Sequence, residues 1–170
     1  MVKKYANKLI VLRGNSGSGK STLARELREN SDKENKIALV EQDYLRRIVL
    51  KEKEKSGGDN IRLIKEVVKF SLFHGYDVIL EGILYSPRYG SMIKNLLKMT
   101  PNHFVYYFDV SLEETLRRHK TKPDSHEFGE KEIRSWYRKN DLLRVEGEKI
   151  IRETSSLQTT IRKILKETGI

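Results

Sequence analysis

A glycine-rich stretch near the N-terminus, Gly14-Asn15-Ser16-Gly17-Ser18-Gly19-Lys20-Ser21, limits the folds open to this chain. It fits the pattern G-x-x-x-x-G-K-[ST], and Thr22 follows it directly. An apolar run over 9–12 precedes the stretch, and apolar residues at helical spacing follow it over 23–27. The pattern and its strand–loop–helix context together predict a loop that binds phosphate groups.

The residue types of this loop suit a nucleoside triphosphate. Glycines let the backbone curl so that successive N–H groups face phosphate oxygens, and the following helix directs its positive end at the same group. Lys20 is placed to reach the β- and γ-phosphates, and the Ser21 hydroxyl is placed to ligate Mg²⁺. We therefore expect a nucleoside triphosphate and Mg²⁺ to bind over 14–22.

Length and composition favour a single polar domain over 1–170. The chain has 170 residues and a formal net charge of +10, which favours anionic ligands, either small molecules or nucleic acid. It has no cysteine, so disulfides and thiolate metal sites are excluded. No apolar run approaches the length of a membrane span, and the apolar stretch near the N-terminus is too short for a signal peptide. We expect a cytoplasmic protein that does not contact membranes.

Apolar strands alternate with helical patterns along the chain, which predicts an α/β fold with a parallel sheet and helices on both faces. Trp136 and Tyr137 fall on the apolar side of a helical pattern and are expected in the core, and Pro87 is expected to break a loop. The expected strands cover 8–13, 37–40, 78–80, 104–108 and 148–152. The expected helices cover 19–29, 44–50, 59–75, 89–99, 111–119, 129–143 and 156–167.

Asp43 follows the second expected strand, and Arg46 comes three residues later. In a short helix this spacing puts both side chains on one face. A carboxylate that faces a bound γ-phosphate can accept the proton of an attacking hydroxyl, and an arginine beside it can hold an anionic group. The alternative is a helix cap with a surface arginine.

Two further carboxylates end apolar strands at the edge where ligands bind in parallel sheets. Glu81 closes the third strand and is a candidate for the Mg²⁺ shell or for contact with an acceptor hydroxyl, although an acid also occurs at a strand end simply because it is excluded from the interior. Asp109 closes the fourth strand and could bind the metal instead of Glu81. The alternative is that this position caps the next helix, since Ser111 follows it.

A cationic run follows the fourth strand, Arg117-Arg118-His119-Lys120-Thr121-Lys122. Cations in this place could stack on a base and close over the transferring phosphoryl group as a lid. The alternative is a solvated basic face, which is what charge runs usually form.

These motifs, in this order, resemble those of the small P-loop kinases, a group that includes polynucleotide 5′-kinases, zeta-toxin-type kinases, chloramphenicol phosphotransferase and gluconate kinase. The resemblance rests on the Gly14–Thr22 loop, the Asp43-x-x-Arg46 pair, the strand ending in Glu81-Gly82, and the strand ending in Asp109 that leads into Arg117-Arg118. It implies a three-layer P-loop NTPase fold with strand order 2-3-1-4-5, a helical lid over about 117–143, and the use of ATP with Mg²⁺.

The resemblance also implies roles for particular residues. Asp43 stands at the position of the general base, and Arg46 at that of the acceptor-phosphate clamp of polynucleotide kinases. Arg118 and Lys122 stand where the family often has two lid arginines, so Lys122 is a departure that keeps the charge and loses the planar fork. Glu81 is a second departure, because aspartate is usual there, and metal ligation by Ser21 and Glu81 follows only by analogy.

The sequence therefore predicts an ATP-dependent kinase that moves the γ-phosphoryl group to a hydroxyl of a small-molecule or nucleoside-type acceptor. Lys20, Asp43, Arg118 and Lys122 are the expected catalytic residues. The expected acceptor contacts are Arg46, Glu81, Tyr85 and Arg88. Two alternatives stand: a polynucleotide 5′-hydroxyl kinase, and a non-catalytic switch ATPase. The sequence leaves the acceptor and the oligomeric state open.

Overall fold

A computed structural model, which describes residues 4–32, 34–120 and 129–170, contains a five-stranded parallel sheet. The strand order is β2-β3-β1-β4-β5, as the resemblance implies, and every neighbouring pair is parallel. The strands are β1 (Leu9–Gly14), β2 (Ile37–Glu41), β3 (Asp77–Gly82), β4 (His103–Asp109) and β5 (Glu148–Arg152).

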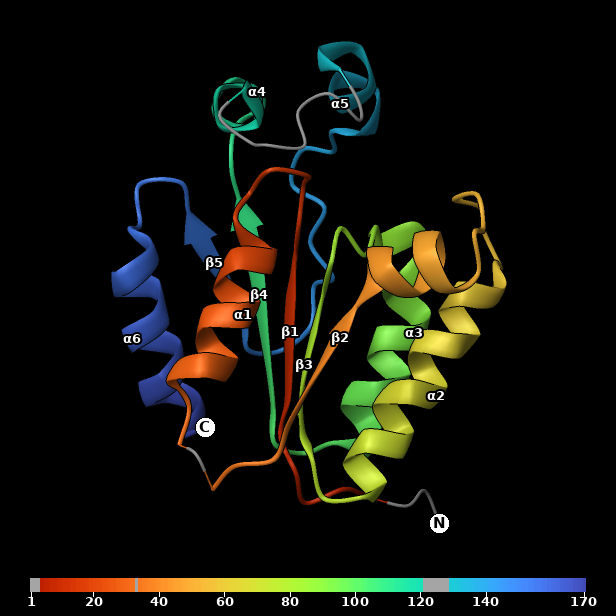
Figure 1. The fold of residues 1–170 in the computed structure, drawn as a ribbon, viewed down its shortest axis with the longest axis vertical. Coiled ribbons are helices and arrows are strands. Elements are labelled where there is room, and N and C mark those ends of the chain that lie inside the picture. The colour runs from red at the N-terminus through yellow and green to blue at the C-terminus, as the bar shows by residue number, and fades with distance from the viewer. Residues whose placement is uncertain (1–3, 33, 121–128) are drawn as a thin grey trace.

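Helices cover both faces of this sheet (Figure 1). One face carries α1 (Lys20–Asn30) and α6 (Leu157–Thr168), and the other carries α2 (Asp59–Phe73) and α3 (Ser86–Met99). Three shorter helices are η1 (Tyr44–Val49), α4 (Leu112–Lys120) and α5 (Glu130–Trp136). The last two lie beyond the carboxyl ends of the strands, at the top of Figure 1. The layers are those of a P-loop NTPase fold.

The central strand β1 shows why the inner strands of the sheet are mainly apolar. Alternate side chains of a strand point to opposite faces, and here both faces are covered. Leu9 and Val11 pack into the core on the α2–α3 side, whereas Ile10 and Leu12 pack into the core on the α1–α6 side. The sheet therefore has two cores, and the strand between them carries no exposed position.

The end of β1 approaches β4 closely. Gly14 pairs with Phe108 and has a φ of 146°, a conformation that L residues rarely adopt. A Cβ atom at Gly14 would lie 2.7 Å from the Phe108 carbonyl oxygen. Glycine is therefore required where the strand turns into the phosphate loop.

The structure corrects three expectations. Pro87 does not break a loop but lies in the first turn of α3, which begins at Ser86 rather than 89, because the missing N–H of proline is tolerated there. Helix α5 ends at Trp136 rather than 143, because the side chains of Arg13 and Asn15 bind backbone groups in the residues that follow it. Trp136 is 43% exposed and does not lie in the core.

Within the three described ranges, no helix combines the length and apolar character needed to span a bilayer.

Candidate functional site

The glycine-rich loop joins β1 to α1 in an open, curled conformation. Gly17 and Gly19 have φ values of 74° and 95°, which the absence of a Cβ permits. A Cβ at Gly19 would meet a single group, the Arg118 Nη1 atom at 4.0 Å. The Lys20 ammonium is buried, and it donates to the Asn15 carbonyl at 2.7 Å and to Ser18 Oγ at 3.1 Å. The loop thus keeps its cation in place and leaves a cradle that fits phosphate groups.

The neighbouring strand supplies a carboxylate to this loop. The Ser21 hydroxyl donates to Glu81 Oε1 at 3.1 Å, from the first turn of α1 to the end of β3. Burial raises the pKa of Glu81 above its usual range, while the Lys20 charge opposes that shift. Hydroxyl and carboxylate oxygens are the donors that Mg²⁺ prefers, so Ser21 and Glu81 together fit this ion beside a triphosphate.

The other carboxylate considered for the metal, Asp109, lies at the end of β4 in register with Arg152 of β5. The helix that follows is capped by Ser111, whose Oγ accepts from the Glu114 N–H at 3.2 Å. The contact with Ser21 therefore favours Glu81 over Asp109 as the carboxylate of the metal site.

A cavity of about 380 Å³ adjoins the phosphate loop. It is bounded by Ser18 and Gly19, by the end of β4, by α4 and by the segment over 152–157. Arg118 lies across it, because its Nη1 donates to the Ser18 carbonyl and its Nη2 to the Glu153 carbonyl, each at 3.2 Å. The cavity has the place and size to take the rest of a nucleotide whose phosphates bind the loop.

Of the cationic run, Arg117 and Arg118 both contact Glu114, and these contacts hold the pKa of Glu114 down at about 2. Arg117 is exposed, whereas Arg118 also reaches the phosphate loop. Arg117 therefore fits the alternative of a solvated basic face, whereas Arg118 fits that of a residue of the site. Lys122 lies outside the described residues.

Asp43 and Arg46 lie together beyond β2, as their spacing predicts. Arg46 Nη2 is 2.8 Å from Asp43 Oδ1, with Arg46 on η1 and Asp43 just before it. About half of the Asp43 side chain is exposed, so its carboxylate is accessible. The charge of Asp43 is one of the weaker causes that raise the pKa of Glu81, so the two carboxylates lie within electrostatic range of each other.

The remaining predicted acceptor residues, Tyr85 and Arg88, lie at the start of α3. Tyr85 is the N-cap residue of this helix, and the Arg88 guanidinium carbon is 5.8 Å from the centre of the Tyr85 ring. Arg138, which no sequence motif indicated, is 5.4 Å from the same ring. Arg88 is also joined to Arg46, because Glu54 forms ion pairs with both. The structure thus brings together the predicted acceptor residues after β2 and β3.

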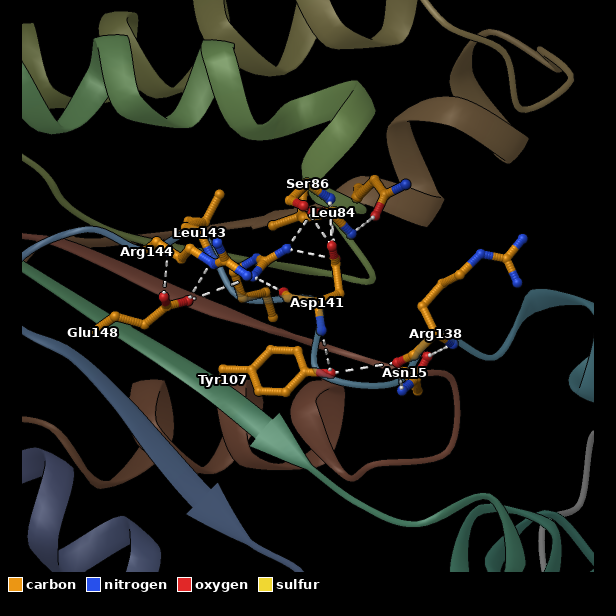
Figure 2. A network of polar contacts seen from close by, with 11 residues as sticks. Asn15, Leu84, Ser86, Tyr107, Arg138, Asp141, Leu143, Arg144 and Glu148 are labelled. Atoms are coloured by element: carbon orange, nitrogen blue, oxygen red, sulfur yellow. Dashed lines mark hydrogen bonds and ion pairs between the residues drawn. The ribbon is translucent and has the colours of Figure 1, made fainter.

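The structure also reveals a buried network that the motifs did not indicate (Figure 2). Arg13 of β1 is fully buried, and its Nη2 lies 2.7 Å from Asp141 Oδ2 and 3.0 Å from the Leu84 carbonyl. Its Nη1 contacts the Asp141 carbonyl and lies 3.5 Å from Glu148 Oε1. Asp141 accepts in turn from the N–H and hydroxyl of Ser86. An arginine in a central apolar strand was the available signal, because a buried cation needs partners.

Asn15 has a second contact that its place in the motif did not indicate. Its Nδ2 donates to the Arg138 carbonyl at 2.7 Å, and its Oδ1 accepts from the Arg138 N–H at 2.8 Å. Figure 2 shows this reciprocal pairing beside the Tyr107 hydroxyl. The phosphate loop and the segment after α5 are therefore joined directly.

Comparisons with known proteins identify the family and the fold of this chain. The family model described as an AAA domain matches residues 9–143. A comparison with curated protein sequences gave no match. The solved structure of the APS kinase CysC from Mycobacterium tuberculosis, in complex with AMPPNP and APS, has a TM-score of 0.72 at 18% identity over 98% of this chain and 99% of that one.

Two further solved structures have the same fold. A gluconokinase from Sinorhizobium meliloti 1021 has a TM-score of 0.62 at 17% identity, over 98% of this chain and 94% of that one. The tunicamycin resistance protein of Deinococcus radiodurans has a TM-score of 0.63 at 17% identity, over 96% of both chains. At these identities the likeness shows that the fold is shared with P-loop kinases.

Proposed function

The chain belongs to the AAA domain family, and from this membership and its site we propose that it is an ATP-dependent phosphotransferase. It transfers the γ-phosphoryl group of ATP to a hydroxyl group of a small-molecule or nucleoside-type acceptor. The observation that carries the proposal is the arrangement of two carboxylates at the ends of neighbouring strands, Glu81 in β3 and Asp43 just beyond β2. Glu81 contacts the phosphate loop through Ser21, and Asp43 lies near enough for its charge to act on Glu81.

In this proposal the phosphate loop over 14–22 and the groups around it hold the nucleotide. Main-chain N–H groups of the loop and the Lys20 ammonium bind the β- and γ-phosphates, and Arg118 closes over them from α4. Ser21 and Glu81 hold Mg²⁺, which would neutralise negative charge on the phosphates when bound. The cavity beside Ser18 takes the nucleoside. Binding there places the γ-phosphate toward the ends of β2 and β3.

The residues that follow β2 and β3 bind the phosphoryl acceptor and supply the group that takes its proton. Asp43 takes the proton of the acceptor hydroxyl as its oxygen forms a bond to the γ-phosphorus, and the bond from that phosphorus to the bridging oxygen of ADP breaks. Arg46 contacts Asp43 at 2.8 Å and so holds the carboxylate in place. Arg46, Tyr85 and Arg88 are the proposed acceptor contacts on this side.

The decisive variant is Asp43→Asn. It should bind ATP as the native protein does, because Asp43 lies outside the phosphate loop, and it should lose about 10²–10⁴-fold in transfer rate with the proton acceptor gone. The measurement combines titration with ATP and a screen of nucleosides, sugars and aminoglycosides for ADP release. Asp32→Asn, in the turn before β2 at the opposite edge of the sheet, is the matched control. Transfer by Asp43→Asn at the native rate would show that the proton acceptor is another group.

The same ADP-release assay, with a 5′-hydroxyl oligonucleotide added to the screen, separates two other functions. A polynucleotide 5′-hydroxyl kinase, which the Asp43–Arg46 pair and the net charge of +10 favour, would phosphorylate a 5′-hydroxyl oligonucleotide in a salt-sensitive reaction. A switch ATPase would release ADP slowly at a rate that no added alcohol changes.

A further inference from the structure

Leu84, which lies between β3 and α3, has a strained backbone. Its φ is 47°, in the left-handed region that residues with a Cβ atom rarely adopt. The residue is fully buried in the core on the α2–α3 side. Strain of this kind persists only where the surrounding structure holds the backbone firmly, and it is concentrated at functional sites. The contacts that hold Leu84 therefore point to a function.

Both polar backbone groups of Leu84 are bound by side chains that are distant in the sequence. The Leu84 N–H donates to Gln42 Oε1 at 2.9 Å, and the Leu84 carbonyl accepts from Arg13 Nη2 at 3.0 Å. Gln42 is 1% exposed and Arg13 is fully buried, so water does not compete for either contact. Gln42 follows β2 and Arg13 belongs to β1, the two strands that flank β3. Leu84 is thus held from both neighbouring strands.

The two side chains that bind this backbone are themselves fixed by their surroundings. Gln42 Nε2 donates to the Tyr89 hydroxyl at 2.9 Å. Gly82 leaves room for the Gln42 side chain, because a Cβ atom at Gly82 would overlap Gln42 Cβ and Oε1. Arg13 Nη2 lies 2.7 Å from Asp141 Oδ2. The glutamine and the arginine therefore have little freedom to move.

Each residue of this buried triad, defined as Arg13, Gln42 and Leu84, directly precedes a residue of the proposed site. The residues that follow are the first residue of the phosphate loop, the proposed proton acceptor and a proposed acceptor contact, which are Gly14, Asp43 and Tyr85 respectively. Consecutive Cα atoms lie about 3.8 Å apart, so each of these residues takes its position from the triad. Two hydrogen bonds thus join the three parts of the site below the surface.

We infer that the triad consists of positioning residues, which align the acceptor hydroxyl with Asp43 and with the γ-phosphorus of ATP. The inference rests on the proposed function, because it takes the acceptor to bind between Asp43 and Tyr85. All three residues are buried and act through their neighbours in the sequence. A displacement of about 1 Å between reacting groups can lower a rate about 10²-fold, so the strain at Leu84 serves the alignment on which transfer depends.

The first test uses Gln42→Met, which keeps the length of the side chain and removes its hydrogen bonds. The full chain receives ATP, Mg²⁺ and the alcohol that the screen selects, and the phosphorylated alcohol and inorganic phosphate are both measured. Transfer requires an aligned alcohol, whereas hydrolysis uses water, which needs no contact with Tyr85. Gln42→Met should lower the ratio of transfer to hydrolysis by about tenfold or more and raise KM for the alcohol. The Kd of AMPPNP should stay unchanged, because the phosphate loop is intact.

This ratio does not depend on how much of the protein is folded, because the unfolded chain catalyses neither reaction. Gly82→Ala should lower it in the same way, since the new Cβ atom displaces Gln42. The control is Tyr106→Phe, which removes a hydrogen bond of 2.7 Å to Glu167 from a buried side chain in the core on the α1–α6 side and should keep the native ratio. A native ratio in Gln42→Met or Gly82→Ala, or an equal fall in Tyr106→Phe, would overturn the inference and leave the proposed function standing.

The second test, hydrogen exchange measured by mass spectrometry, needs no acceptor. In Gln42→Met the Leu84 N–H loses its acceptor, so exchange of the amides over 83–88 should become about tenfold faster or more, while exchange over 104–108 in β4 stays unchanged. A native protein that phosphorylates no alcohol would overturn the proposed function. Faster exchange would then leave standing the hold of the triad on the segment over 83–88, and unchanged exchange would overturn the triad as well.

Discussion

Two irregular segments meet at the carboxyl edge of the sheet, the phosphate loop over 14–22 and the start of the segment over 137–148 that follows α5. The phosphate loop takes its shape from its own glycines and from contacts inside the motif, such as that of Lys20 with the Asn15 carbonyl. The segment over 137–148 contains a single glycine. Its backbone is bound instead by side chains that come from β1 and from the phosphate loop, and by the side chain of its own last residue, Glu148.

The two segments differ in which residues determine their conformation. The conformation of the phosphate loop depends mainly on its own adjacent residues, which include its glycines, although Phe108, Arg118 and Arg138 also contact it. The conformation of the other segment depends on residues as far as 135 positions away, of which Arg13 is the most buried. We therefore expect substitutions to affect the segment over 137–148 through remote partners, and the phosphate loop through its own backbone.

The largest effect should come from Asp141→Ala, which leaves the fully buried Arg13 without its nearest carboxylate. Loss of one partner of a buried ion pair costs about 3–5 kcal/mol in the free energy of unfolding. Urea unfolding measures this cost. The matched control is Glu130→Ala, which breaks the exposed pair with Arg134 and should leave the free energy of unfolding almost unchanged, because solvent screens exposed ion pairs. Similar costs for the two variants would show that the segment does not depend on Arg13.

A somewhat smaller effect is expected from Gly14→Ala, which tests the phosphate loop through its own backbone. The substitution forces an L residue to a φ of 146° and puts a Cβ atom 2.7 Å from the Phe108 carbonyl oxygen. Strain and overlap together should lower the free energy of unfolding by about 2–4 kcal/mol. The control is Gly57→Ala, which has a φ of 69° and open space around the new Cβ, and it should cost about 1–2 kcal/mol. Equal costs would mean that β4 moves at Phe108 to make room for the new Cβ atom.

Asn15→Ala joins the two segments in one experiment, because Asn15 belongs to the phosphate loop and binds both backbone groups of Arg138. Loss of these two hydrogen bonds should cost about 1–3 kcal/mol. It should also free the backbone after α5, so trypsin should cleave at Arg138 faster while cleavage at Lys166 in α6 is unchanged. Native cleavage rates at Arg138 would show that the two segments are independent.

The smallest effect should be a pH dependence of the free energy of unfolding that arises from Glu81, beside the phosphate loop. Burial raises the pKa of Glu81 in the folded state, so above the usual value of 4.5 the folded protein binds more protons than the unfolded chain. The free energy of unfolding should therefore fall as the pH rises from 4.5 through the raised pKa. Glu81→Gln should flatten this part of the curve in urea unfolding between pH 4 and 8. An identical slope in the variant would assign the titration to another group.

The parts of the site that the sequence predicts are those encoded by near neighbours. The glycine–lysine motif, the contact of Asp43 with Arg46 three residues later, and the strands with both faces buried all follow from local spacing. The strand order itself came from the resemblance to P-loop kinases rather than from any local pattern.

The end of α5 could not be predicted in the same way. The helical pattern continues to Leu143, but Asn15 binds Arg138 from 123 positions away, and Arg13 binds Asp141. Those contacts outweigh the helical preference of the intervening residues, which is small for each residue. Glu54 was likewise hidden, because nothing in a charged loop indicates that one acid meets Arg46 and Arg88.

The central position of β1 has a consequence for the order in which the chain can fold. The phosphate loop follows the first strand of the sequence, yet β1 pairs only with β3 and β4, whose residues lie 60 to 100 positions later. Such distant pairings close long loops and form slowly. During synthesis, the contact of Gly14 with Phe108 cannot form until β4 has been made. The earliest motif to leave the ribosome is therefore among the last to reach its final shape.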